Sequence, residues 1–187
     1  MKQLYVISLI ALFICGCSGG YKQQGETAAN DLTFASTDSA DDQALAAGVL
    51  QRVEAMYKDV FRHFSEEKDA SWSSDIYFSN ALFSLWHQMP DDELVIDSDP
   101  WTMAQDFDTL ACKGIDILVL EQDSALVNVV VFLSEKWPSN TIQLKLVREQ
   151  HKDADHAEWY IDDFRSDDYS VASQIKDYLK ESQQDPS

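Results

Sequence analysis

Four aspartates beside aromatic residues are the side chains of this sequence whose types and spacing could do chemistry. Two of them, Asp99 and Asp106, flank Trp101 in a predicted loop, so their carboxylates could bind a cation or an amine. Aspartates at such positions more often cap a turn or the start of a short helix. We therefore expect capping first for Asp99 and Asp106, and we keep both, with Trp101, as candidate binding residues.

The other two aspartates stand at the end of an apolar segment. Asp162 and Asp163 follow the run 159–161, and Arg165 is nearby. A buried carboxylate beside aromatic side chains could act as a general base in an isomerase-like pocket. A local ion pair or a cap explains the two residues equally well. Asp163 is therefore a candidate binding residue, and the sequence predicts no catalytic residue and leaves enzymatic activity open.

The histidines and the acidic loop argue against a metal site. His63, His87, His151 and His156 have no metal-ligand spacing among themselves, which argues against zinc. The acidic run 91–99 lacks the glycine and the fixed ligand spacing of an EF-hand loop. We therefore predict no metal and no cofactor.

The first residues have the features of a secretory signal. Lys2 precedes an apolar run over 4–14, followed by small residues. The run is too short for a membrane-crossing helix, which needs about 20 apolar residues to span a ~30 Å hydrocarbon core. We predict that residues 1–16 are a signal peptide that is removed.

The run ends in the sequence ICGC at 14–17, which resembles the bacterial lipobox. In that motif an aliphatic and a small residue precede a cysteine that receives a lipid. Gly16 is small enough to precede the cleaved bond, whereas Ile14 before Cys15 is not. The resemblance therefore implies lipidation of Cys17, and the alternative is an ordinary cleaved signal with a free Cys17.

A lipid on Cys17 would fix the protein to a membrane. Two or three acyl chains, such as palmitate, make attachment effectively permanent. Ser18 rather than aspartate follows the cysteine, which by resemblance to enteric lipoproteins favours the outer membrane. No acidic run follows directly, so we expect the domain to face the periplasm.

The composition of residues 17–187 predicts how this part of the chain is divided into a tether, a domain and a tail. Residues 17–42 are rich in Gly, Ser, Thr, Gln, Ala and Asp, which predicts a lipidated cysteine followed by a flexible tether. Its typical reach is about 25 to 30 Å. We predict one globular domain over 43–182 and a disordered tail over 183–187. Cys112 would then be the only thiol left, which excludes an intrachain disulfide.

Charge limits the partners. The chain has 33 acidic and 14 basic residues, a formal net charge of −19. Phosphate binding needs clustered Lys and Arg, so no nucleic acid partner is expected. Anionic lipid surfaces should repel the domain as well, so contact with the membrane must come from the lipid.

Hydrophobic periodicity predicts three helices. Apolar residues recur at steps of three and four over 45–64 and again over 74–88, where Pro90 ends the second helix. A closing helix follows, with Val171, Ile175 and Leu179 on one face.

Between the second and third helices the pattern alternates with period two. The four runs lie at 115–119, 127–133, 142–146 and 159–161, and short loops favour an antiparallel meander. The first two runs are apolar on both faces, because Leu118 opposes the Ile115 set and Phe132 the Val127 set. We expect the last helix to cover the second face; otherwise the patch is a partner site or a dimer interface.

These elements define an α+β fold, with two N-terminal helices packed on a curved four-stranded antiparallel sheet and a C-terminal helix. The order resembles the nuclear-transport-factor-2-like (cystatin-like) fold, which ketosteroid isomerase also uses. DPW at 99–101, QD at 105–106 and WYIDDF at 159–164 resemble the YbjP-like family of bacterial envelope lipoproteins, over roughly residues 47 to 180. The resemblance implies fold and localisation, and no reaction or catalytic residue.

Three functions remain open from the sequence. The leading one is a non-catalytic binding or accessory module for an envelope protein or a cell-wall component. The second is a small-ligand binder or enzyme with a ketosteroid-isomerase-like pocket. The third is an immunity protein against an envelope toxin, because strong acidity suits a basic target. The oligomeric state is not determined by the sequence.

Overall fold

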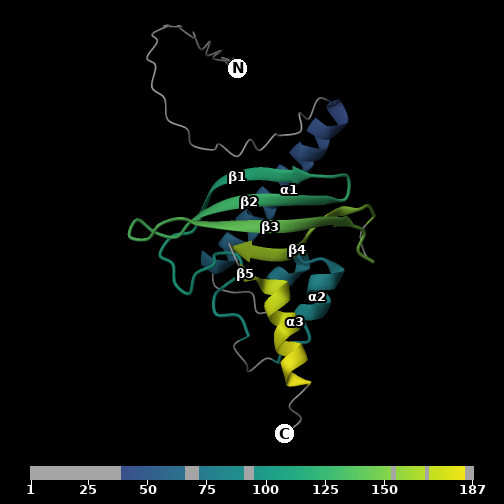
Figure 1. Ribbon diagram of the computed structural model, residues 1–187. Coiled ribbons are helices and arrows are strands. Elements are labelled where there is room, and N and C mark those ends of the chain that lie inside the picture. Colours follow the sequence, from purple (N-terminus) through teal and green to yellow (C-terminus); the bar gives the residue numbers. More distant parts are fainter. Residues whose placement is uncertain (1–38, 66–71, 91–94, 153–154, 167–168, 184–187) are drawn as a thin grey trace, which may run out of the picture. The chain divides into compact units, whose positions relative to one another are not determined.

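The computed structural model describes residues 39–65, 72–90, 95–152, 155–166 and 169–183 (Figure 1). The predicted signal peptide, Cys17 and the tether up to residue 38 lie outside these residues, as does the tail over 184–187. The described elements form an α+β fold and confirm that class. In chain order they are α1 (Ala40–Ser65), η1 (Ser74–Tyr77), α2 (Asn80–Trp86), β1 (Ala111–Leu120), β2 (Ser124–Phe132), β3 (Asn140–Glu149), β4 (Glu158–Ser166), β5 (Tyr169–Ser170) and α3 (Val171–Ser182).

Helix α1 forms where the apolar spacing predicts it. Ser39 precedes the helix, and its hydroxyl accepts a hydrogen bond from the amide of Asp42 at 3.1 Å, which caps the first turn. The helix begins at Ala40, inside the stretch assigned to the tether. Its buried side chains are Val49, Val53, Met56, Tyr57 and Val60.

The continuous second helix predicted over 74–88 is wrong, because the chain divides there into η1 and α2. Between them Phe78 forms a parallel bridge with Ile161 of β4, and the Ser79 amide donates to the Ile161 carbonyl at 2.8 Å. Ser79 then caps α2, since its hydroxyl accepts from the Leu82 amide at 3.0 Å. Pairing with a strand edge requires extended backbone, so a single helix is not possible.

The four predicted strands form the predicted antiparallel meander. The order is β1-β2-β3-β4-β5, and the two-residue β5 is an addition that sequence periodicity did not indicate. In the β1–β2 turn, the Glu121 amide donates to the Ser124 carbonyl at 2.8 Å. Register shifts interrupt the β1–β2 ladder at two places, between Cys112 and Gly114 and between Ile117 and Val119.

The inner face of the sheet carries the core. Val127, Val129 and Val131 of β2 are fully buried together with the alternate residues of β3. They belong to one apolar cluster with the buried face of α1, and α1 packs against β1.

The last helix does not cover the second face of the first two strands, so that prediction is wrong. Helix α3 packs against β4 and α2, and Figure 1 shows it on the β4 side of the sheet, away from β1. Only two residues, 167 and 168, separate β4 from β5, which leads directly into α3. The connection is therefore too short for α3 to reach β1.

In the described part of the chain, no helix is both long and apolar enough to pass through a bilayer.

Candidate functional site

Aromatic side chains fill the space between α1 and the sheet. Trp101 is 1% exposed, and its ring centroid lies 5.4 Å from that of Tyr57 and 5.1 Å from that of Phe164. Phe78 completes the cluster, stacked on Trp101 at 6.5 Å. Trp101, predicted as a binding residue, is thus at the centre of the core, and its surroundings leave no room for a ketosteroid-isomerase-like pocket there.

Two polar atoms of this aromatic cluster have no hydrogen-bond partner among the described residues, the hydroxyl of Tyr57 and the indole nitrogen of Trp101. Burial, and then the nearby groups of Cys112 and Asp99, raise the pKa of Tyr57 well above its ordinary value. Its hydroxyl is therefore protonated at neutral pH and cannot serve as a base.

Asp99 caps the turn that carries Trp101, in agreement with the role expected first. Its Oδ1 accepts from the amides of Trp101 at 2.9 Å and Thr102 at 3.1 Å. The turn is held to the start of β3, because the side-chain amide of Asn140 donates to the carbonyls of Thr102 and Met103, both at 2.9 Å. Asp99 therefore positions the tryptophan.

Asp106 does not share this role. Its side chain is exposed and forms no hydrogen bond or ion pair with the described residues. The structure therefore does not join Asp106 to Asp99 and Trp101 in one binding site.

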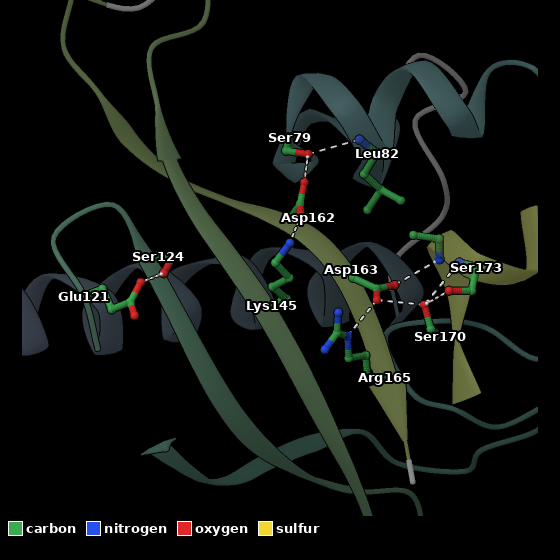
Figure 2. Close-up of polar contacts among 11 residues, drawn as sticks. Ser79, Leu82, Glu121, Ser124, Lys145, Asp162, Asp163, Arg165, Ser170 and Ser173 are labelled. Carbon is green, nitrogen blue, oxygen red and sulfur yellow. Dashed lines mark hydrogen bonds and ion pairs between the residues drawn. The ribbon is translucent and has the colours of Figure 1, made fainter. Parts of the chain in front are cut away.

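Asp163 is 3% exposed and fully engaged in structural contacts (Figure 2). Its carboxylate accepts from Arg165 Nε at 2.7 Å, from the Ser170 hydroxyl at 2.8 Å and from the Ala172 amide at 2.9 Å. The residue thus joins β4, β5 and the first turn of α3. This is the ion pair and cap that the sequence allowed.

Asp162 occupies the bulge of β4 and has a different set of partners. Its two oxygens accept from Lys145 Nζ at 2.6 Å and from the Ser79 hydroxyl at 2.9 Å, as Figure 2 shows. Burial alone would raise the pKa of Asp162, but these two hydrogen bonds, together with the charges of Lys145 and Lys176, outweigh it and lower the pKa from its ordinary 3.8. A lowered pKa is the opposite of what a general base at neutral pH needs.

The described residues contain no group of three or more His, Cys, Asp or Glu side chains that could hold a metal ion. Each histidine instead lies near one carboxylate. The pairs are His63 with Asp59 at 3.6 Å, His87 with Asp75 at 2.8 Å, His151 with Glu149 at 2.8 Å and His156 with Glu158 at 3.4 Å.

An apolar surface lies on the outer face of β1 and β2, and we call it the outer patch. Leu118 and Val119 are 41% and 48% exposed, and the β2 residues beside them are half-buried. No described helix packs over them. The apolar residues on both faces of these strands were the signal for this patch in the sequence. Its members are Leu118, Val119, Leu126, Val130 and Phe132.

A concave surface that the sequence did not reveal lies between α1 and the start of β4, and we call it the α1–β4 groove. It has a volume of about 640 Å³. Its residues come from segments a hundred positions apart, which no spacing rule joins. The side chains and backbone that matter for its chemistry are those of Leu45, Gly48, Arg52, Arg148, His156 and Trp159.

Comparisons with protein-family models, with curated proteins and with solved structures give no match. The resemblances to the nuclear-transport-factor-2-like fold and to the YbjP-like lipoproteins therefore stay predictions.

Proposed function

We propose that this protein is a lipid-anchored envelope protein that binds a partner protein through the outer patch. The observation that carries the proposal is the exposure of Leu118 and Val119, at 41% and 48%, beside the half-buried Leu126, with which Val119 pairs. Val130 and Phe132 lie further along the same face, beyond the polar Asp116–Asn128 pair. Single exposed apolar residues are normal, whereas contiguous ones mark interaction sites. The protein is proposed to act as a binding module without catalysis.

The irregular edge of the sheet indicates which groups would contact a partner. β1 is an edge strand, and its register shifts at two places. Bulges of this kind twist an edge and oppose pairing with a further strand. Side chains of the outer patch, rather than the backbone of β1, would therefore provide the contact. Lys113 lies 4.8 Å from the ring centroid of Phe132 and adds a cation beside the apolar surface.

The sequence supports the proposed location. The lipobox-like residues ending at Cys17 would hold the chain at a membrane, and Ser18 favours the outer membrane with the domain in the periplasm. A net charge of −19 argues against nucleic acid as the partner. An envelope protein with an apolar contact surface is the partner that suits both the proposed location and the negative charge.

The binding surface can be tested by photocrosslinking in cells at native expression. A photoreactive amino acid at Val119 should give a specific crosslinked adduct with an envelope protein, and the same probe at Ile76 of η1, which is 53% exposed, is the matched control. The substitution Leu118→Asp should abolish the adduct at Val119 while the protein stays folded. Recovery of no envelope protein, or of an adduct of twice the chain mass, would contradict the proposal, the latter in favour of a dimer interface.

The anchoring requires a separate experiment. Cys17→Ser should move the protein from the membrane fraction to the soluble or unprocessed fraction, because the modified sulfur is lost. Wild-type processing and unchanged membrane fractionation of this variant would refute the lipid anchor and leave the crosslinking result unaffected.

A further inference from the structure

The α1–β4 groove has an apolar floor. One stripe of α1, including Leu45 and Gly48, forms one side, and Trp159 at the start of β4 forms the other. Trp159 is only 6% exposed, so its ring is fixed by the core. The volume of about 640 Å³ falls within the range of roughly 300 to 1,000 Å³ that is typical of small-molecule sites.

Gly48 keeps the groove open. A Cβ atom added at this position would meet no heavy atom of the described residues within 4 Å, so the described part of the chain leaves the space above the helix backbone open. Glycine inside a helix lowers stability by about 0.5 to 1 kcal/mol relative to alanine. No packing contact with a described residue explains the glycine, whereas a ligand lying against the backbone of α1 would.

Two of the four arginines of the chain line this one groove. Arg52 is held in place, because its Nε donates to the Trp159 carbonyl at 3.2 Å and its Nη2 lies 3.0 Å from Glu158 Oε2. Arg148 is different, since its guanidinium makes no hydrogen bond or ion pair with any described residue. Arg148 pairs with Trp159 in the β3–β4 register, which places both residues at the same end of the sheet.

The other charges of the groove decide which anion fits. Asp41 and Glu158 also line it, and Glu158 already faces Arg52 at 3.0 Å and His156 at 3.4 Å. The two arginines balance the charge of the two carboxylates. Arg52 is already paired with Glu158, whereas the Arg148 guanidinium has no partner among the described residues and can pair with one carboxylate. A dianion such as a phosphate monoester would carry a second negative charge next to Asp41 and Glu158 and would be repelled.

We propose that the α1–β4 groove binds a small organic monocarboxylate with an apolar body. The carboxylate pairs with the guanidinium of Arg148, which offers parallel N–H donors. The apolar body lies over Gly48 against Leu45 and Trp159. This site is distinct from the outer patch, and the proposal does not depend on the lipid anchor or on the protein partner.

Hexanoate is a suitable probe, with 1-hexanol as its uncharged counterpart. The full chain is kept in solution in phosphatidylcholine nanodiscs, and the amide signals of its glycines are followed by NMR. Hexanoate should shift the Gly48 amide signal in a saturable way and leave that of Gly114 in β1 unchanged. Hexanol should bind at least about tenfold more weakly, because it lacks the charge-assisted contact.

Two substitutions separate the ligand site from the fold. Arg148→Gln should weaken hexanoate binding by about tenfold or more, whereas Arg62→Gln, an exposed arginine at the other end of α1, should leave it unchanged. Gly48→Leu should fill the groove and abolish binding, while the free energy of unfolding does not fall. Equal binding of hexanol and hexanoate, wild-type affinity in Arg148→Gln, or retained binding in Gly48→Leu would each overturn the proposal.

Discussion

Both faces of strand β2 carry apolar side chains, but in very different surroundings. On the inner face, Val127, Val129 and Val131 are completely buried, since they lie in one cluster with α1. On the outer face, Val130 and Phe132 are half-buried, and no described helix covers them. Apolar residues on both sides of a strand therefore show that both faces could be buried. Which face is covered depends on how the chain connects the strand to the helices.

The largest expected effect comes from the aromatic centre behind the inner face. Trp101→Ala should lower the free energy of unfolding by about 3 to 5 kcal/mol, because the largest fully buried side chain is lost and leaves a cavity. Urea unfolding of the variant measures this. The matched control is Trp137→Ala, which removes a tryptophan that is 42% exposed and should change stability by less than about 0.5 kcal/mol. Similar losses in the two variants would mean that the interior is not packed by Trp101.

A pair of neighbouring valines tests the comparison directly. Val129→Ala should lower the free energy of unfolding by about 2 kcal/mol, since the side chain is fully buried on the inner face. Val130→Ala removes the same two methyl groups from the outer face and should have an effect of less than about 1 kcal/mol. Both variants are measured by urea unfolding at one temperature. Equal losses would show that something covers the outer patch in solution.

Much of the fold could be predicted because local patterns determine it. The three-and-four spacing of α1 and the alternation of β1 to β4 follow from which side chains must be buried. The break at Phe78 could not be predicted, because it depends on a bridge to Ile161, more than eighty residues later. The position of α3 likewise depends on the short β4–β5 connection, which keeps α3 beside β4. This could not be predicted without knowing where β4 lies in the sheet.

The candidate site was less predictable than the fold. Asp99 was correctly expected to be a cap, because an aspartate can accept from the amides two and three residues later. Asp163 also caps, but its amide donor is Ala172, nine residues later, so local spacing only allowed this role. Trp101, a candidate binding residue from the sequence, lies in the core, and the sequence does not show which aromatic side chains are buried there. The α1–β4 groove brings Gly48 and Arg148 together from distant parts of the chain, and the glycine inside the predicted helix over 45–64 was its only signal in the sequence.

The polar contacts of β4 should make stability depend on pH. The pKa of Asp162 is lowered in the folded protein, so its carboxylate stabilises the fold above its ordinary pKa of 3.8 and loses this effect as the pH falls through the folded value. Asp162→Asn should therefore be less stable than the wild type at about pH 7, by about 1 kcal/mol or less because Lys145 is partly exposed.

The difference between wild type and Asp162→Asn should shrink when urea unfolding is repeated near pH 3. Asp106→Asn, which changes an exposed carboxylate without contacts among the described residues, is the control and should show little difference at either pH. A gap between wild type and Asp162→Asn that stays constant with pH would exclude the Lys145–Asp162 pair as its source.

The smallest expected effect contrasts the two sides of α1, one packed on the inner face of the sheet and one lining the groove. Gly48→Ala should raise the free energy of unfolding by about 0.5 to 1 kcal/mol, because alanine restricts the unfolded chain and the added Cβ meets nothing. The reverse change at the exposed neighbour, Ala47→Gly, should lower it by a similar amount, and urea unfolding measures both. A change to alanine would stabilise the helix, yet position 48 is glycine. This supports the proposal that a ligand occupies the open space above it. A loss of stability in Gly48→Ala would instead show that the groove is closed by a contact in solution, and that glycine is required there for packing.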